Sequence, residues 1–280
     1  MKVREISRGA HHFTFQNVGS GWTQKALFIS DVHWDSKKCD RKLLKKHFEQ
    51  AKKDNALIFI FGDWFDVMGC KNDPRSKPKD IRPEYLIEGS YLDLVVEDAV
   101  KFLKNYLDNI AFISPGNHET AIDKHRDTDP LKNMIRELNH MRKTPIMYGK
   151  YEGWIKFQIE RSGIPNKSKL LHYHHGYGGN AKRSKSILNA DIDMKENPDA
   201  DILVSGHTHT KWHLPAVVRR LTNQMRVIKK KVHVLKTGSY KMKGSGWETE
   251  KGFGEPTLGG WWCELAYFKD EIEIRIAEAS

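Results

Sequence analysis

Five short clusters of aspartate, asparagine and histidine contain the side chains of this sequence that are best suited to binding metal ions and transferring protons. In chain order they read Asp31-Val-His33, Gly62-Asp63-Trp-Phe-Asp66, Gly116-Asn117-His118-Glu119, His172-Tyr-His174-His175-Gly176 and Gly206-His207-Thr-His209. Clustered carboxylates repel one another without a counter-charge, and buried polar groups cost free energy unless they are paired. Divalent cations resolve both problems, and mixed nitrogen and oxygen ligands suit Mn, Fe, Zn, Ni or Co better than Ca or Mg.

The clusters together hold more ligands than one ion needs. Two aspartates, one asparagine and four histidines would all be used by two ions about 3.5–4 Å apart that share one carboxylate. The residue types therefore indicate a dimetal site.

Each cluster directly follows a run of strand-forming residues. The runs are KALFIS (25–30), ALIFIF (56–61), IAFIS (110–114), KLLHYHH (169–175) and DILVS (201–205). Almost wholly apolar runs of this length are typical of strands buried on both faces. Because ligands of open α/β sheets bind where the carboxyl ends of strands gather, we expect the five clusters to converge.

Helices separate the first three strands. Apolar periodicity predicts helices at about 40–53 and 91–108, and Asp129 followed by Pro130 is typical of an N-cap and first helical position. After residue 145 strands dominate, ending in a hairpin at 262–277. The order β-α-β-α-β and then mainly β favours two packed sheets flanked by helices in a single domain, residues 1–280.

The five clusters, in this order and each after a buried strand, resemble the motifs of the calcineurin-like metallophosphoesterase superfamily. The resemblance spans residues 28–209, and Thr237-Gly238-Ser239-Tyr240 is similar to a Gly-Ser segment that often follows. It implies an α/β fold, a four-layer α/β/β/α sandwich of two mixed sheets flanked by helices. It also implies a phosphoester hydrolase with two divalent metal ions, for which we expect Mn, with Fe, Zn, Ni and Co as alternatives.

The resemblance also implies a role for each matching residue. Asp31, His33 and His209 correspond to ligands of the first metal, Asp63 to the bridging carboxylate, and Asn117, His175 and His207 to ligands of the second. A hydroxide between the ions would attack phosphorus in line. His118 would protonate the leaving oxygen or stabilise the transition state. Asp66 is expected to support the site rather than bind metal.

The crowded histidines at 172–175 leave a choice of ligand. Successive side chains of a strand point to opposite faces, so His172 and His174 share one face and His175 points with Tyr173. In the resembling family the ligand precedes the glycine at the strand end, which selects His175 here. His174 is the alternative if this register is off by one residue.

The distribution of charge bears on the substrate. Residues 211–243 hold ten of the lysines and arginines and no acidic residue, in a chain of net charge +11. The segment RRLTNQMRVIKKK within it is predicted to form a basic loop or hairpin near the metals, as tracking of a DNA or RNA backbone needs. The alternative is a solvated loop. Lys182 and Arg183, beside the glycines of 176–179, are candidate phosphate contacts.

We therefore expect a phosphodiesterase or nuclease-type enzyme acting on nucleic acid or nucleotide. Gly-Asp63-Trp-Phe-Asp66 is similar to the version found in repair-nuclease and sugar-nucleotide diphosphatase branches of the superfamily. The alternatives are a small-molecule phosphomonoesterase or nucleotide pyrophosphatase, and a non-catalytic metal-binding scaffold. Motifs alone do not choose between mono- and diesters.

The remaining composition favours a cytoplasmic protein without a membrane span or an obligate protein partner. No run of about 18 apolar residues is present, and the N-terminus lacks the apolar core of a signal peptide. The three cysteines, Cys39, Cys70 and Cys263, are far apart and form no CxxC pair, so neither a disulfide framework nor a zinc ribbon is supported.

Overall fold

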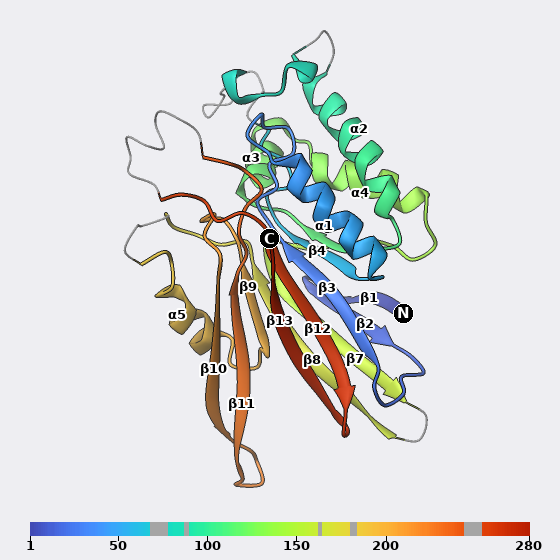
Figure 1. Cartoon of the computed structure of the whole chain (residues 1–280), viewed down its shortest axis with the longest axis vertical. Coiled ribbons are helices and arrows are strands. Elements are labelled where there is room, and N and C mark those ends of the chain that lie inside the picture. The colour runs from blue at the N-terminus through green and yellow to red at the C-terminus, as the bar shows by residue number, and fades with distance from the viewer. Residues whose placement is uncertain (68–77, 87–89, 162–163, 180–183, 244–253) are drawn as a thin grey trace.

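The computed structural model describes residues 1–67, 78–86, 90–161, 164–179, 184–243 and 254–280. Its strands form two mixed sheets packed against each other, with helices on the outside (Figure 1). This is the predicted four-layer α/β/β/α arrangement, although within the described ranges one outer layer contains a single short helix. None of the described helices is long and apolar enough to cross a membrane.

The six-stranded sheet has the order β13-β12-β3-β4-β5-β6. Its strands are β3 Thr23–Ile29, β4 Leu57–Phe61, β5 Ile110–Ser114, β6 Met147–Tyr148, β12 Gly260–Phe268 and β13 Glu271–Ala279. β3 to β6 are parallel, so their carboxyl ends meet at one edge of the sheet. The apolar runs in β4 and β5 are wholly buried, as their composition predicts. β12 and β13 form the predicted C-terminal hairpin.

The seven-stranded sheet has the order β1-β2-β7-β8-β9-β11-β10. Its strands are β1 Lys2–Ser7, β2 Ala10–Phe15, β7 Glu152–Arg161, β8 Ile164–His174, β9 Ile202–Ser205, β10 Trp212–Leu221 and β11 Val227–Lys236. β8, β9 and β11 are parallel, so their carboxyl ends also share one edge. The N-terminal strands β1 and β2 are absent from the sequence prediction.

Four helices cover the outer face of the six-stranded sheet (Figure 1). They are α1 Arg41–Lys53, α2 Tyr91–Leu103, α3 Asn117–Arg126 and α4 Pro130–His140. The Asp129 carboxylate accepts a hydrogen bond from the Lys132 amide, which confirms the predicted cap of α4. α2 is shorter than predicted because the chain tightens into a 3-10 turn at Lys104–Tyr106. Two further 3-10 turns lie at Pro78–Asp80 and Pro83–Tyr85.

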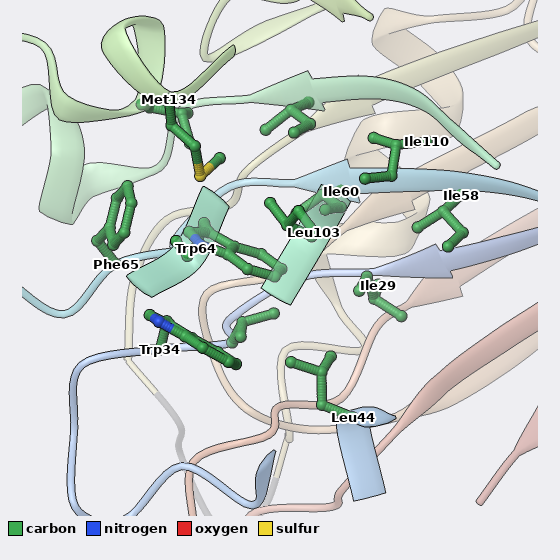
Figure 2. Packing of buried hydrophobic residues seen from close by; sticks show 14 of the residues in the cluster. Ile29, Trp34, Leu44, Ile58, Ile60, Trp64, Phe65, Leu103, Ile110 and Met134 are labelled. Carbon is green, nitrogen blue, oxygen red and sulfur yellow. The ribbon is translucent and has the colours of Figure 1, made fainter. Parts of the chain in front are cut away.

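The core beneath these helices also fixes the loops that leave β3 and β4. Trp34, Trp64 and Phe65 come from those loops and are buried with strand and helix residues such as Ile60 and Leu103 (Figure 2). The Trp34 and Trp64 rings stack with their centroids 5.8 Å apart. The backbone next to the polar clusters is therefore anchored by packing.

The fourth layer is α5, Asn189–Glu196, on the outer face of the seven-stranded sheet. Its Ala190 belongs to a small apolar cluster with Leu203, Val232 and Val234. A larger aromatic core, which includes Phe28, lies between the two sheets.

The basic segment forms the β10–β11 hairpin, but its predicted position near the polar clusters is wrong. The residue pairs that lie directly opposite each other in the hairpin, here called rungs, run from Trp212–Lys236 to Leu221–Val227. At about 3.4 Å per residue these rungs are about 30 Å apart. RRLTNQMRVIKKK therefore lies at the far end of the ribbon, because regular antiparallel pairing carries it away from the edge where β9 ends.

Candidate metal centre

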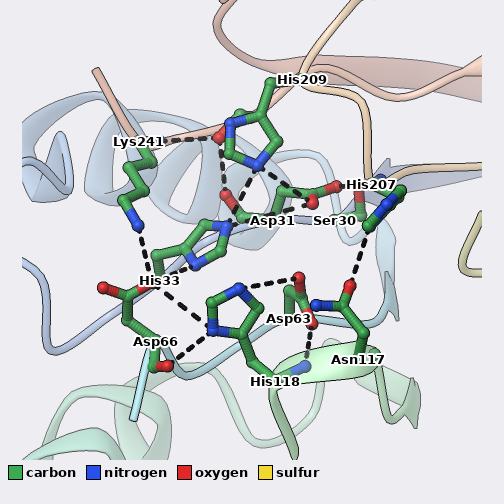
Figure 3. A network of polar contacts seen from close by, with 12 residues as sticks. Ser30, Asp31, His33, Asp63, Asp66, Asn117, His118, His207, His209 and Lys241 are labelled. Atoms are coloured by element: carbon green, nitrogen blue, oxygen red, sulfur yellow. Dashed lines mark hydrogen bonds and ion pairs between the residues drawn. The ribbon is translucent and has the colours of Figure 1, made fainter. Parts of the chain in front are cut away.

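All five polar clusters meet at the edge where the parallel strands of both sheets end. Asp31 and His33 follow β3, Asp63 follows β4, Asn117 and His118 follow β5, His175 follows β8, and His207 and His209 follow β9. Most of these side chains point toward one another in Figure 3. Three groups of His and Asp ligand atoms each fall within 4.8 Å, so the predicted convergence is confirmed.

The first group contains Asp31, His33 and His209. His209 Nε2 lies 3.3 Å from Asp31 Oδ1 and 3.2 Å from His33 Nε2. Asp31 Oδ1 is buried and has no hydrogen-bond partner. Such a buried acceptor is costly unless a cation or a donor meets it, so its environment fits a metal ion.

The second group contains Asp63, His175 and His207, joined by Asn117. His175 Nε2 lies 3.2 Å from Asp63 Oδ2 and 3.1 Å from Asn117 Oδ1. His207 Nδ1 lies 2.8 Å from the same Asn117 oxygen. Asp63 also lies in the group formed with His33 and His118, so its carboxylate is common to two groups of ligand atoms.

Hydrogen bonds from the outer ring nitrogens fix which nitrogen faces the centre. His175 Nδ1–H donates to the Phe61 carbonyl at 2.9 Å, and His207 Nε2–H donates to the Gly178 carbonyl at 3.0 Å. His33 Nδ1–H donates to Asp66 Oδ1 at 2.8 Å. In the neutral tautomer each ring then directs a lone pair inward, which is the arrangement that metal-binding histidines need.

The shifted pKa values of His175 and Asp31 agree with a site that binds cations. Burial lowers the pKa of His175, but the Asp63 carboxylate outweighs it and raises the pKa to about 9. Burial would raise the pKa of Asp31, yet His209 holds it below the ordinary range. The same carboxylate that favours a positive charge on His175 would favour a divalent ion between the two side chains.

His118 is placed differently from the other rings. Its Nδ1–H donates to the Asp66 carbonyl at 2.6 Å, which turns Nε2 toward the centre, 3.8 Å from Asp63 Oδ2. Its side chain is 12% exposed, between the buried rings of His33 and His175, at 1% and 0%, and the ring of His209, at 27%. Solvent therefore reaches His118, as a proton donor to a substrate requires.

The backbone at the clusters is strained. Asp31, His33, Asp63, His207 and His209 all have positive φ, between 50° and 73°. This conformation is uncommon for residues other than glycine, and it persists only where the surrounding structure enforces it. The accumulation of five such residues at one edge marks a functional site.

Three glycines preceding cluster residues allow the close approach. A Cβ at Gly116 would lie 2.1 Å from Asp63 Oδ1, and one at Gly62 would lie 2.2 Å from His175 Nδ1. A Cβ at Gly206 would lie 2.2 Å from Ser30 Oγ. The requirement for glycine at these positions is visible in the sequence as the pairs Gly-Asp, Gly-Asn and Gly-His.

Several residues support the centre from behind. Lys241 Nζ lies 2.6 Å from Asp66 Oδ1, the oxygen that accepts the His33 hydrogen bond (Figure 3). Asp66 thus orients His33 through its carboxylate and His118 through its backbone, which agrees with its expected supporting role. Glu119 accepts hydrogen bonds from the amides of Asp63, Phe65 and Gly116.

Lys241 was missed by sequence reasoning. It follows Tyr240 by one residue, but no local pattern of charge or spacing links it to Asp66, 175 positions away. Only the return of the chain after β11 brings the two together.

The histidine cluster resolves as the register predicts. His175 is fully buried within the centre, whereas His174 faces away from it and lies 3.6 Å from Glu152. The His172 ring packs against Trp154, with ring centroids 4.8 Å apart. The structure therefore brings His175 into the centre and leaves the other two out.

Two candidate substrate contacts, Lys182 and Arg183, lie outside the described residues. Trp64 and Phe65, which distinguish the second cluster among related motifs, are completely buried in the core. They support the loop and do not face a substrate.

Comparisons with known proteins agree with this geometry. A family model described as calcineurin-like phosphoesterase matches residues 25–211. No curated protein sequence matches this chain.

Solved structures give weak likenesses over most of the chain. A predicted phosphoesterase of Streptococcus pneumoniae TIGR4 is 13% identical with a TM-score of 0.32, over 92% of this chain and 91% of that one. The calcineurin-like phosphoesterase YfkN of Bacillus subtilis is 12% identical with a TM-score of 0.36, over 92% and 91%. GAP50, described as the anchor in the inner membrane complex of Plasmodium, is 14% identical with a TM-score of 0.41, over 92% and 85%. Likenesses this weak support no inference about activity.

Proposed function

This chain belongs to the calcineurin-like phosphoesterase family, and on that premise we propose that it hydrolyses phosphodiester bonds of nucleic acids or nucleotides. Family membership makes it a metal-dependent phosphoester hydrolase, and the family uses dimetal centres. The choice of phosphodiesters is carried by one observation, the ten lysines and arginines without an acidic residue at 211–243. The segment starts beside the centre at Lys211 and carries most of its charge outward along the β10–β11 hairpin, which suits an extended polyanion better than a small substrate.

The residues at the centre fit two divalent ions. Asp31, His33 and His209 would hold one ion, Asn117, His175 and His207 the other, and Asp63 would contact both. We propose Mn as the physiological metal, with Fe, Zn, Ni and Co as alternatives that the same nitrogen and oxygen donors accept. Bound ions would acidify a water for attack on phosphorus and neutralise charge on the phosphoryl oxygens.

The chain's own groups would complete the reaction. His118 Nε2 would give its proton to the leaving oxygen, because Nδ1 is already committed to the Asp66 carbonyl. Asp66 and Lys241 would keep the His33 and His118 rings in the productive orientation. The aromatic core around Trp34 and Trp64 would hold the strained loops in place.

The test compares Mn-loaded with metal-stripped protein on bis-p-nitrophenyl phosphate and on single- and double-stranded DNA. We expect metal-dependent cleavage of at least one of these diesters and a loss of activity in His118→Ala, with metal content unchanged. A p-nitrophenyl phosphate monoester and a dinucleoside pyrophosphate are run in parallel. Cleavage of those alone would replace the diesterase proposal by a monoesterase or pyrophosphatase, and the absence of any cleavage would leave a metal-binding scaffold.

A further inference from the structure

The β10–β11 hairpin carries cations on both of its faces. Residues directly opposite each other in an antiparallel pair share a face, and the face alternates along the strand. The rung Arg219–Lys229 therefore faces one way, and its neighbours Val218–Lys230 and Arg220–Ile228 face the other. The two faces carry nearly the same positive charge, so the acidic partners of the cations on one face can be compared with those on the other.

Acidic groups neutralise the cations on the face that carries Arg220 and Lys230. Arg220 lies 2.8 Å from Asp199 Oδ1, and Lys230 Nζ lies 3.6 Å from Asp201 Oδ1. The same face holds Val232 and Val234, which pack with Ala190 of α5. We call this the paired face.

The opposite face, which we call the free face, carries Arg219, Lys229 and Lys231. Within the described parts of the chain no acidic side chain forms an ion pair with any of the three. All three are exposed, and the aliphatic side chains between them are exposed as well: Val217 by 65%, Leu221 by 58% and Val227 by 68%. Nothing in the described chain covers this surface.

The free face lies on a ribbon that projects from the molecule (Figure 1). β9 pairs with β11 only from His233 to Lys236, so residues 227–232 pair with β10 alone. The rung Arg219–Lys229 is seven residues from the rung Trp212–Lys236, or about 24 Å at 3.4 Å per residue. Double-stranded DNA advances 3.4 Å per base pair, so this distance corresponds to about seven base-pair steps.

We propose that the free face binds the sugar–phosphate backbone of a nucleic acid, about seven base-pair steps beyond the end of the hairpin that leads from the metal centre. The inference rests on the proposed function and adds a binding surface separate from the chemistry. Arg219, Lys229 and Lys231 would contact phosphates, and the exposed aliphatic side chains would contact the sugars. A second copy of the chain fits this face less well, because two-fold pairing would set these cations against one another.

The test uses two double variants matched in composition and position. Arg219→Met with Lys229→Met removes one arginine and one lysine from the free face. Arg220→Met with Lys230→Met removes the same two residue types one position along, from the paired face. Each variant lowers the net charge by two, so a difference between them reports the face and not the total charge.

Binding is measured with metal-loaded protein by the initial fluorescence anisotropy of a labelled 20-base-pair DNA duplex at several salt concentrations. Loss of two phosphate contacts should reduce the slope of log K against log salt by about 1.8 and weaken binding about tenfold or more at low salt. The free-face variant should show this loss and the paired-face variant should retain most of the slope. On thymidine 5′-p-nitrophenyl phosphate, which is too short to reach the hairpin, both should keep the wild-type kcat and KM.

Equal losses in the two variants, or no loss in either, would overturn the inference. Dissociation of a wild-type dimer by the free-face substitutions, with DNA binding unchanged, would assign the surface to a second copy instead. Failure of the wild type to cleave any diester would refute the proposed function. Face-specific DNA binding by the same protein would still support the hairpin as a nucleic-acid surface.

Discussion

Substitution of Lys241 by methionine tests whether the support behind the centre has the strength that its geometry implies. Lys241 Nζ lies 2.6 Å from Asp66 Oδ1, and the side chains are 14% and 3% exposed. Methionine keeps most of the aliphatic stem and removes the ammonium group. Asp66 would then keep the His33 hydrogen bond but lose the ammonium group that balances its charge.

The expected cost follows from burial. Removing one partner of a buried ion pair costs about 3–5 kcal/mol, because the other charge remains out of water. The partial exposure of Lys241 favours the lower end, about 3 kcal/mol. A domain of 280 residues has an unfolding entropy of about 0.6 kcal/mol/K, so we expect Tm to fall by roughly 5 °C. Burial opposes the charged form of Asp66 and Lys241 stabilises it, so the pKa of Asp66 should rise in the variant.

Thermal unfolding of the metal-free protein measures this effect. Lys243→Met is the matched control, because Lys243 pairs at 2.9 Å with Glu255, whose side chain is 78% exposed. Exposed pairs contribute at most about 1 kcal/mol, so the control should barely shift Tm. Lys241→Arg should recover most of the loss. Equal shifts in Lys241→Met and Lys243→Met would mean that the Lys241–Asp66 pair contributes no more than an exposed ion pair.

Three further predictions follow from single contacts. His175→Ala should lose one metal equivalent by elemental analysis and His174→Ala should lose none; the reverse result would mean that the ligand register is wrong. Gly116→Ala should reduce kcat/KM about 100-fold by displacing the carboxylate 2.1 Å from its new Cβ, whereas Gly179→Ala, with no atom within 4 Å, should be nearly silent. Burial lowers the pKa of His47 from 6.5 to about 4. Between these values the unfolded chain binds a proton that the folded protein does not bind. The free energy of unfolding is therefore highest above about pH 6.5 and decreases as the pH falls toward 4. The urea midpoint should therefore fall less between pH 7.5 and pH 5 in His47→Gln than in the wild type, and equal falls would contradict the assignment.

Features carried by local sequence were predicted well. β4 and β5 are continuous apolar runs, and a run of that length has one stable place, inside a sheet covered on both faces. The cap at Asp129 and the register that selects His175 depend on neighbouring residues alone. Strand β1 escaped prediction because it is almost entirely exposed and lacks a buried face that would impose an alternating pattern. Strand β2 is almost entirely buried, but its sequence AHHFTF mixes histidines and a threonine with apolar residues and so shows neither an apolar run nor an alternation.

Features that depend on distant pairing were not predicted. α3 begins at Asn117, inside a motif whose polar residues hide any helical periodicity, and Glu119 caps it by accepting from Gly116. The basic segment was recognised from its charge, yet its distance from the centre follows from ten unbroken rungs that composition does not reveal.

The five clusters and their order in the chain pointed to the family, whose model matches residues 25–211. Their convergence could be expected because parallel strands carry the residues after them to a common edge. The assignment of individual ligands came from the family resemblance and stays a prediction. Three features became visible only in the folded chain: Lys241 supports Asp66, and five residues of the centre are held with positive φ. The third is that, among the described residues, Arg220 and Lys230 have acidic partners and Arg219 and Lys229 have none. The physical reason is the same in each case. An ion pair or a strained loop depends on which distant segments pack together, and side chains one position apart on a strand meet opposite surroundings.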